Sequence, residues 1–299
     1  MRVFVTGATG FIGSAIVQEL INAGHQVLGL ARSEAGMQSL IAAGAEPHRG
    51  DLDDIESLQR GAAAADGVIH TAFNHDFSNY KASADNDKRV IEAMGAALAG
   101  TKRPLIITSG IGILSGTGKL VTENELPASS PIPRIASEQA ADIVAASGVR
   151  VSVVRLPPSV HGDGDHAFLP ILINIAREKG ISVYQGEGLN RWPAVHRSDV
   201  ARLYRLALEN PAAPGTRFHG VAEEGIPFRD IAEVIGKRLN IPVLSKSKDE
   251  AAAHFGWFAH FAAMDIHASA KQTQEALGWR PTQAGLISDL DTDSYFSLK

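Results

Sequence analysis

Apolar and polar positions change their period several times along the first quarter of the chain. Residues 3–5 form a short apolar run, and residues 14–21 then place apolar side chains three and four positions apart. The first pattern is typical of a buried strand and the second of an amphipathic helix. The same order returns twice before residue 73, which predicts an α/β fold with a doubly wound parallel sheet.

The pattern predicts strands at residues 3–5, 26–30, 45–49, 67–73, 150–156, 216–220 and 241–244. It predicts helices at residues 14–21, 33–43, 55–65, 167–179, 198–208 and 227–236, followed by a mostly helical stretch at 248–277. Ser198 is expected to be the N-cap of the helix at 198–208, and residues 211–215 are expected to form a linker.

Composition narrows the class of protein. A chain of 299 residues fits one large α/β domain, or a main domain with a smaller lobe. The net charge of -5 forms no basic stripe, so we expect no nucleic-acid partner. The absence of cysteine excludes disulfides, thiolate catalysis and cysteine zinc sites. We expect no membrane span and a cytoplasmic location, because there is neither a long apolar run nor a signal-peptide pattern.

Three glycines stand between the first strand and the first helix. Gly7 permits a tight turn, Gly10 lets backbone N–H groups approach a phosphate, and Gly13 lets the helix pack closely on the strand. The N-terminus of the helix then faces the negative charge of a pyrophosphate. The alternative is a tight turn without a ligand. The position of the three glycines between a strand and a helix favours dinucleotide binding.

The end of the second strand decides which dinucleotide is bound. An NAD site usually has an acidic residue here for the ribose 2′-hydroxyl, and an NADP site has a basic one. This chain has Ala31 at that position, followed by Arg32 and Ser33, which can hold a 2′-phosphate. The alternative for Arg32 is a solvated surface side chain. The sequence favours NADP(H) over NAD.

An acidic turn follows the third strand. Asp51 can accept a hydrogen bond from the adenine amino group, with Leu52 beside the ring. The alternative is that Asp53 simply caps the next helix, and both can hold at once.

Several segments together resemble the short-chain dehydrogenase/reductase superfamily, in its extended or atypical, epimerase/dehydratase-like branch. They are residues 6–13 (TGATGFIG), 50–54 (GDLDD), 68–72 (VIHTA), 105–109 (LIITS), 153–162 (VVRLPPSVHG) and 192–200 (WPAVHRSDV). The resemblance implies a Rossmann-type cofactor core and a smaller C-terminal substrate lobe. The core would take residues 1–156 with parts of 190–220, and the lobe about 157–190 and 221–299.

The resemblance also implies which further residues bind the cofactor. They are Thr9, Phe11, Ile12, Thr71, Ala72, Phe73, Thr108, Arg134, Leu156, Pro157 and Ser159.

The catalytic motif of the superfamily is incomplete in this chain. Its members usually use a serine, a tyrosine and, four residues after the tyrosine, a lysine. If Glu138 matches a glutamate that often follows the lysine, Arg134 takes the lysine position and Ser130 the tyrosine position. Gly110 falls where many relatives have the serine, with Ser109 just before it. A Tyr-x-x-x-Lys does occur at 295–299, but at the end of the chain, and we interpret it as a chance match.

Other residues are candidates for the missing chemistry. Arg134 can bind ribose hydroxyls or polarise an oxygen, but it cannot donate a proton near neutral pH. In the loop after the fourth strand, His75 titrates near neutral pH and Asp76 can orient it, while Tyr80 is a further candidate acid. The alternative is that His75 and Asp76 are polar loop residues. Ser109 completes the set of catalytic candidates.

Three other features leave alternatives open. Residues 161–166 (HGDGDH) contain possible metal ligands, but their spacing matches no defined site and we expect no metal. His161, in this segment, is a further candidate for direct function. The aromatic cluster at 254–261 is either core packing, which we favour, or the apolar lid of a substrate pocket. By analogy with relatives, a homodimer would form through helices at 83–99 and 134–146.

Three functions are compatible with these residues. The first is an NADP(H)-dependent oxidoreductase of small carbonyl or hydroxyl compounds, with a non-standard proton donor. The second is a regulator or sensor that binds NADP(H) without turnover, and the missing tyrosine favours it. The third is a nucleotide-sugar epimerase or dehydratase, which usually needs that tyrosine.

Overall fold

The computed structural model describes residues 1–127, 130–210 and 212–297 and has a seven-stranded sheet at its centre. Every neighbouring pair in this sheet is parallel, in the order β11–β7–β5–β4–β1–β2–β3. Its strands are β1 (Arg2–Thr6), β2 (Gln26–Ala31), β3 (Glu46–Arg49), β4 (Gly67–His70), β5 (Pro104–Gly110), β7 (Arg150–Leu156) and β11 (Thr216–His219). The doubly wound parallel sheet predicted from the sequence is confirmed.

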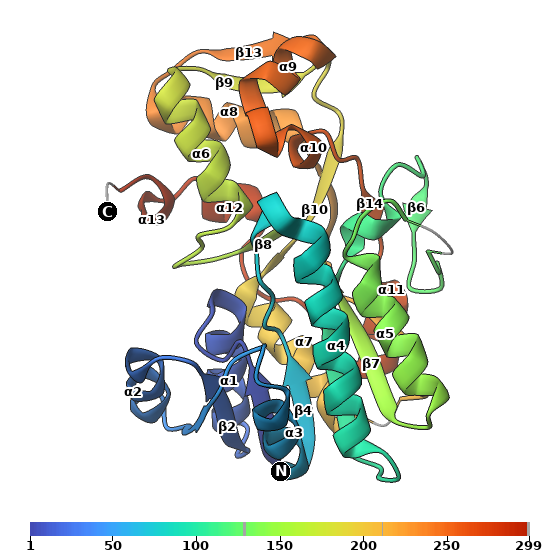
Figure 1. Ribbon diagram of the computed structural model, residues 1–299. Helices are drawn as coiled ribbons and strands as arrows, with labels where there is room; N and C mark the ends of the chain where they lie inside the picture. The colour runs from blue at the N-terminus through green and yellow to red at the C-terminus, as the bar shows by residue number, and fades with distance from the viewer. Residues whose placement is uncertain (128–129, 211, 298–299) are drawn as a thin grey trace.

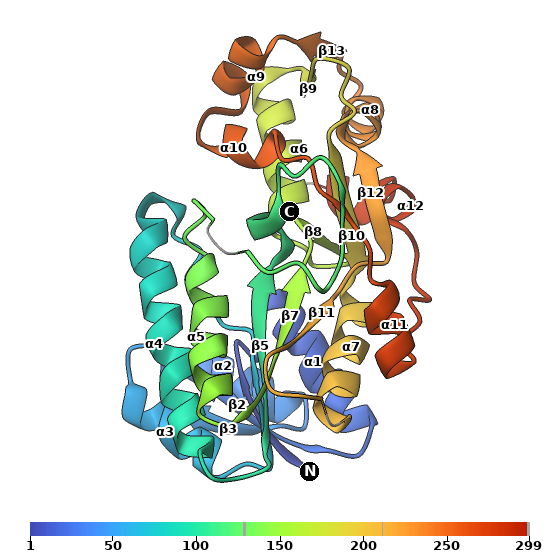
Figure 2. The same cartoon turned by 90° about the vertical axis from the view of Figure 1, so that its right-hand side faces the viewer.

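Helices cover both faces of this sheet (Figures 1 and 2). One face carries α1 (Phe11–Asn22), α2 (Glu34–Ala42), α7 (Arg197–Glu209) and α11 (Lys271–Leu277). The other carries α3 (Ile55–Ala63), α4 (Tyr80–Leu98) and α5 (Ile135–Ala146). Because both faces are covered, the central strands are apolar on both sides, as in the fully buried run Val3–Val5. The dimer expected through α4 and α5 stays a prediction.

A second group of elements lies beyond the carboxyl ends of the central strands (Figure 2). It contains three small sheets, with the strand orders β12–β10–β8, β13–β9 and β14–β6. Their strands are β6 (Leu120–Val121), β8 (Ser159–His161), β9 (Ser182–Gln185), β10 (Arg191–His196), β12 (Glu223–Pro227), β13 (Val243–Lys246) and β14 (His267–Ala268). The helices are α6 (Phe168–Lys179), α8 (Phe228–Leu239), α9 (Lys248–Phe255), α10 (Ala259–Ala262), α12 (Leu286–Leu290) and α13 (Asp293–Phe296).

The structure corrects several element boundaries. Strand β4 ends at His70, not at residue 73, so Thr71–Phe73 belong to the loop that leaves the sheet. Helix α7 begins at Arg197, and its N-cap is His196, whose ring accepts from the Ser198 N–H, so the prediction of Ser198 as N-cap was wrong. Residues 248–277 contain three short helices, a 3₁₀ turn and a strand. Aromatic packing in this stretch produces apolar spacing without a continuous helix.

The predicted linker at 211–215 begins at Pro211, which lies outside the described residues. Among the described residues, no helix has the length and apolar character needed to cross a membrane.

Candidate active site

The glycine turn between β1 and α1 leaves no room for side chains. Gly7 has φ +70°, and a Cβ there would lie 2.7 Å from both the Ala72 nitrogen and the Thr71 Oγ1. A Cβ at Gly13 would lie 1.9 Å from the Gly7 carbonyl oxygen. Gly10 is the N-cap of α1 and supplies no side-chain cap, so the first N–H groups of the helix stay open to an acceptor. This cradle fits a dinucleotide pyrophosphate.

Arg32 and Ser33 lie next to this turn, between β2 and α2. Arg32 is exposed. Ser33 caps α2 by accepting from the Gly36 N–H at 3.1 Å, which places its hydroxyl at the start of the helix. A Cβ at Gly36 would lie 3.6 Å from the Thr9 methyl group, so the start of α2 adjoins the glycine turn. A cation and a hydroxyl therefore lie together beside the glycine turn, at the start of α2.

The turn after β3 is held by its own carboxylates. Asp51 Oδ1 accepts from the Asp53 N–H at 2.8 Å and the Asp54 N–H at 3.1 Å. The N-cap of α3 is Asp54, which accepts from the Ser57 N–H at 2.9 Å. The alternative that Asp53 caps this helix was wrong, because the turn is one residue longer than expected. Asp51 keeps its second oxygen as an acceptor for an adenine amino group.

Two predicted cofactor residues turn their hydroxyls into the protein. Thr71 Oγ1 donates to the Thr6 carbonyl at 2.8 Å. Thr108 Oγ1 donates to the His70 carbonyl at 2.8 Å and shares a 2.6 Å hydrogen bond with Tyr204. Each hydroxyl therefore donates its proton within the protein, so neither can donate to a ligand.

The other predicted cofactor residues lie along the same edge of the sheet. Phe11 carries the Arg197 guanidinium over its ring, 4.8 Å from the ring centroid. Ser159 is buried on β8, and its Oγ has no hydrogen-bond partner among the described residues. Five further predicted cofactor residues are half-buried or buried: Ile12, Ala72, Phe73, Leu156 and Pro157.

Arg134 lies in a buried ionic network rather than in open space. Its guanidinium donates to Asp87 at 2.7 Å, to Ser137 at 2.9 Å and to the Thr108 carbonyl at 2.9 Å. Burial acts to raise the pKa of Asp87, but Arg134 and His70 outweigh it and hold that pKa below its usual range. The guanidinium also lies over the Phe73 ring, 3.9 Å from its centroid. Arg134 thus places a permanent positive charge against the face of the Phe73 ring.

The residues that the sequence aligns with the usual catalytic motif lie before α5 and at the end of β5. Helix α5 begins at Ile135, so Ser130 stands before the helix, where its Oγ accepts from the Ile132 N–H at 3.3 Å. Ser109 is buried, and its Oγ has no hydrogen-bond partner in the described chain. A Cβ at Gly110 would meet nothing within 4 Å, so the space for a serine side chain exists but is open.

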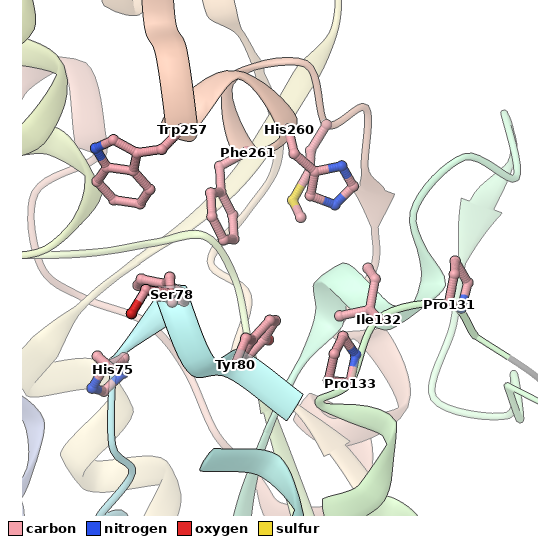
Figure 3. Close-up of a pocket in the computed structure, with 11 residues that line it drawn as sticks. His75, Ser78, Tyr80, Pro131, Ile132, Pro133, Trp257, His260 and Phe261 are labelled. Carbon is pink, nitrogen blue, oxygen red and sulfur yellow. The ribbon is translucent and has the colours of Figure 1, made fainter. Parts of the chain in front are cut away.

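An aromatic pocket of about 600 Å³ lies between the core and the C-terminal elements (Figure 3). Side chains from three separate segments form its walls: His75, Phe77, Ser78 and Tyr80; Pro131, Ile132 and Pro133; Trp257, His260, Phe261 and Met264. Trp257, His260 and Phe261 face Tyr80, Ile132 and Pro133 across the space. No lysine, arginine or carboxylate is among these lining residues.

The aromatic cluster at 254–261 serves both of the uses expected for it. Phe255 and Phe258 are buried in the core, as packing requires. Trp257 is 61% exposed and stacks on Phe77, with ring centroids 5.9 Å apart. Phe261 packs on the same Phe77 ring at 5.0 Å. Different residues of one short segment therefore fill the core and cover the pocket.

His75 lines this pocket without the partner expected for it. No hydrogen bond joins it to Asp76 in the described structure; Asp76 instead accepts from the Ser78 N–H and caps a 3₁₀ turn. The prediction that Asp76 orients His75 was wrong, because the turn takes the carboxylate. Desolvation, and then the charge of Arg134, lower the pKa of His75. Its imidazole is therefore neutral at neutral pH.

The segment at 161–166 is tied to the C-terminal helices. His161 is buried and bonds Asp289 at 2.7 Å, so it does not line the aromatic pocket. Tyr295 donates to Asp165 at 3.2 Å, which gives this tyrosine a structural contact. Its motif partner, Lys299, lies outside the described residues. Within the described ranges, no group of three or more His, Cys, Asp or Glu could hold a metal ion.

Sequence reasoning named His75, Tyr80, Arg134 and the aromatic cluster at 254–261, but it missed Pro131–Pro133 and the buried partners of Arg134. Asp87 and His70 are buried and joined at 2.9 Å. An acid in the middle of an otherwise apolar helix face was the available signal for Asp87. Pro131–Pro133 carried no signal, because they reach the pocket only through the path of the chain before α5.

Comparison with known proteins gives a consistent assignment. A family model described as the NAD dependent epimerase/dehydratase family matches residues 3–219. An uncharacterized protein of Schizosaccharomyces pombe is 55% identical over 297 residues, covering 99% of this chain and 100% of that protein. The 2-alkyl-3-oxoalkanoate reductase of Stenotrophomonas maltophilia is 27% identical over 266 residues, covering 83% of this chain and 78% of that enzyme.

A solved structure supports the fold. UDP-glucuronic acid 4-epimerase from Bacillus cereus, in complex with UDP-glucuronic acid and NAD, superposes with a TM-score of 0.76. The match covers 98% of each chain at 19% identity, so it bears on the architecture alone.

Proposed function

Because the chain belongs to the NAD-dependent epimerase/dehydratase family, we propose that it is an NADP(H)-dependent oxidoreductase of a small carbonyl or hydroxyl compound. An NAD(P) cofactor is typical of the family. A nicotinamide bound there would supply or accept the hydride. Gly7, Gly10 and Gly13 would hold the pyrophosphate, and Arg32 with Ser33 would hold the 2′-phosphate that distinguishes NADP from NAD.

The lining of the aromatic pocket carries this proposal. Its walls are aromatic rings, prolines, an isoleucine and a methionine, with His75, Ser78, Tyr80 and His260 as the polar members. A nucleotide-sugar diphosphate needs cations or backbone N–H groups for its phosphates, and the lining residues include no Lys or Arg. The pocket suits an uncharged, largely apolar aldehyde or ketone, whose carbonyl needs one hydrogen-bond donor.

Turnover of carbonyl compounds with NADPH tests the proposed function. Purified protein with NADPH is offered a panel of uncharged aliphatic and aromatic aldehydes and ketones, and the absorbance of the reduced nicotinamide is followed. We expect turnover on several apolar carbonyl compounds and none on UDP-glucose, because the pocket walls do not neutralise a diphosphate. NADPH affinity is measured separately by protein-fluorescence titration.

The outcomes separate the three functions. Tight NADPH binding without turnover on any carbonyl compound would favour a sensor and contradict the oxidoreductase. Interconversion of nucleotide sugars without net cofactor oxidation would identify an epimerase.

A further inference from the structure

All four tyrosines of the chain lie in the described part of the structure, and they differ in their surroundings. The Tyr204 hydroxyl is fully buried and shares a 2.6 Å hydrogen bond with a threonine of β5. The Tyr295 hydroxyl is held by the turn at 162–165. Tyr184 lies on β9, away from the aromatic pocket. Tyr80, the first residue of α4, is the tyrosine that lines this pocket.

Few side chains of the pocket can give a proton to a bound ligand. Among the lining residues, the ionisable groups are His75, Tyr80 and His260. His75 has a lowered pKa, so its imidazole has already lost the acidic proton at neutral pH. His260 belongs to α10, on the opposite wall from α4 (Figure 3). Tyr80 keeps its proton at neutral pH, because its pKa is raised. It lies on the pocket wall formed by the segment that follows β4.

Tyr80 also stands near a permanent positive charge. Its ring packs edge-on against Phe73, with centroids 6.1 Å apart, and the Phe73 ring also contacts His75 and the Arg134 guanidinium. Burial raises the pKa of Tyr80, Arg134 acts to lower it, and Asp87 acts to raise it. Arg134 therefore favours the phenolate that remains after proton donation, although Phe73 separates the two groups.

We propose that Tyr80 is the catalytic proton donor, replacing from α4 the tyrosine whose usual position before α5 is taken by Ser130, with Arg134 as a positioning charge. This inference rests on the proposed oxidoreductase function. In the usual motif one helix supplies both the phenol and the positive charge. Here α4 supplies the phenol of Tyr80, and Arg134 at the start of α5 supplies the positive charge. The hydrogen bond between Arg134 and Asp87 of α4 fixes the separation of the two groups.

The reaction balances with NADPH as the reductant. Hydride adds to the carbonyl carbon, the π electrons of the C=O bond move to the oxygen, and the O–H bond of Tyr80 breaks as its proton goes to that oxygen. The carbonyl compound is reduced to an alcohol and NADPH is oxidised to NADP⁺. The Tyr80 phenolate then takes a proton from water. The alkoxide that would otherwise form is a stronger base than a phenolate, so the transfer is downhill.

The test is Tyr80→Phe in the full chain, with Tyr184→Phe as the matched control. General-acid catalysis contributes about 10²–10⁴-fold, so kcat of Tyr80→Phe should fall about 100-fold or more. NADPH affinity, KM and the thermal midpoint should stay close to wild type, because the Tyr80 hydroxyl makes no hydrogen bond to the described residues. Tyr184→Phe should retain the wild-type kcat.

A spectroscopic measurement needs neither substrate nor cofactor. Difference absorbance between the wild-type and Tyr80→Phe proteins reports the phenolate of Tyr80 as the pH rises, with His75, His260, Arg134 and Asp87 as its charged or titratable neighbours. The transition should occur above the usual tyrosine value of about 10. Replacing tyrosine by 3-fluorotyrosine should move this transition, and the high-pH decline of kcat, to lower pH together.

The outcomes distinguish this inference from the proposed function. No turnover by the wild-type protein overturns the oxidoreductase, and with it the proton donor. Turnover by the wild type that Tyr80→Phe leaves within threefold overturns the role of Tyr80 alone. A loss of kcat in His75→Gln, with Tyr80→Phe active, would identify His75 as the donor instead.

Discussion

The glycine turn and the aromatic pocket are assembled in opposite ways. The glycine turn comes from one contiguous segment, residues 6–13, in which each glycine has a geometric requirement of its own. The aromatic pocket takes its walls from residues 75–80, 131–133 and 257–264. Backbone geometry defines the first region, whereas tertiary packing defines the second.

The glycine turn and the aromatic pocket therefore tolerate substitution to different degrees. The turn binds through N–H groups and the absence of side chains, so adding one methyl group damages it. The pocket binds through apolar surface shared among many rings, so removing one ring weakens it only in part. Substitutions in the aromatic pocket are therefore expected to leave the glycine turn intact.

The largest expected effect is that of Gly13→Ala on the turn. Its Cβ would overlap the Gly7 carbonyl oxygen, and overpacking of this kind costs about 2–3 kcal/mol. NADPH affinity should fall about 100-fold in calorimetric titration, with a lower thermal midpoint. Gly112→Ala is the control, because its Cβ would meet Met264 at an ordinary 3.6 Å. Equal NADPH binding by both variants would contradict the tight cradle.

Arg32→Ala tests the specificity of the same region with a smaller effect. A hydrogen bond to a charged group contributes about 1.5–3 kcal/mol, so NADPH affinity should fall about 20-fold while NADH affinity stays unchanged. Arg60→Ala removes an exposed arginine from α3 and should change neither affinity. If wild-type protein binds NADH as tightly as NADPH, the role given to Arg32 is wrong.

Trp257→Ala is expected to have the smallest effect. Trp257 stacks on Phe77 and covers the aromatic pocket, and an aromatic pair contributes about 0.5–1.5 kcal/mol. KM for an aromatic aldehyde should rise about fivefold, with NADPH affinity and stability nearly unchanged because the ring is exposed. Leu189→Ala, another exposed apolar residue, is the control. A loss of NADPH binding in Trp257→Ala would show that the two regions are not separable.

The same contrast explains what the sequence could predict. The parallel sheet and the glycine turn follow from local patterns, because strand, turn and helix are consecutive there. The alignment of Ser130 and Arg134 with the usual motif stays a prediction. The contacts of Arg134 with Asp87 and the meeting of Trp257 with Phe77 were not predictable, because they join residues 47 and 180 positions apart in the chain. His75 and Tyr80 were candidates by residue type alone. The choice between them as proton donor depends on the surrounding charges and on the walls of the aromatic pocket, which the sequence does not show.

Isotope transfer from NADPH reports the proposed hydride step itself. NADPH deuterated at the transferable position of the nicotinamide is incubated with the protein and an apolar aldehyde, and the alcohol is analysed by mass spectrometry and NMR. We predict one deuterium on the carbinol carbon, with much less labelled alcohol when Gly13→Ala replaces the wild type at the same subsaturating cofactor concentration. Alcohol without deuterium, or no alcohol although NADPH is bound, would contradict the assignment of this protein as an NADP(H)-dependent oxidoreductase.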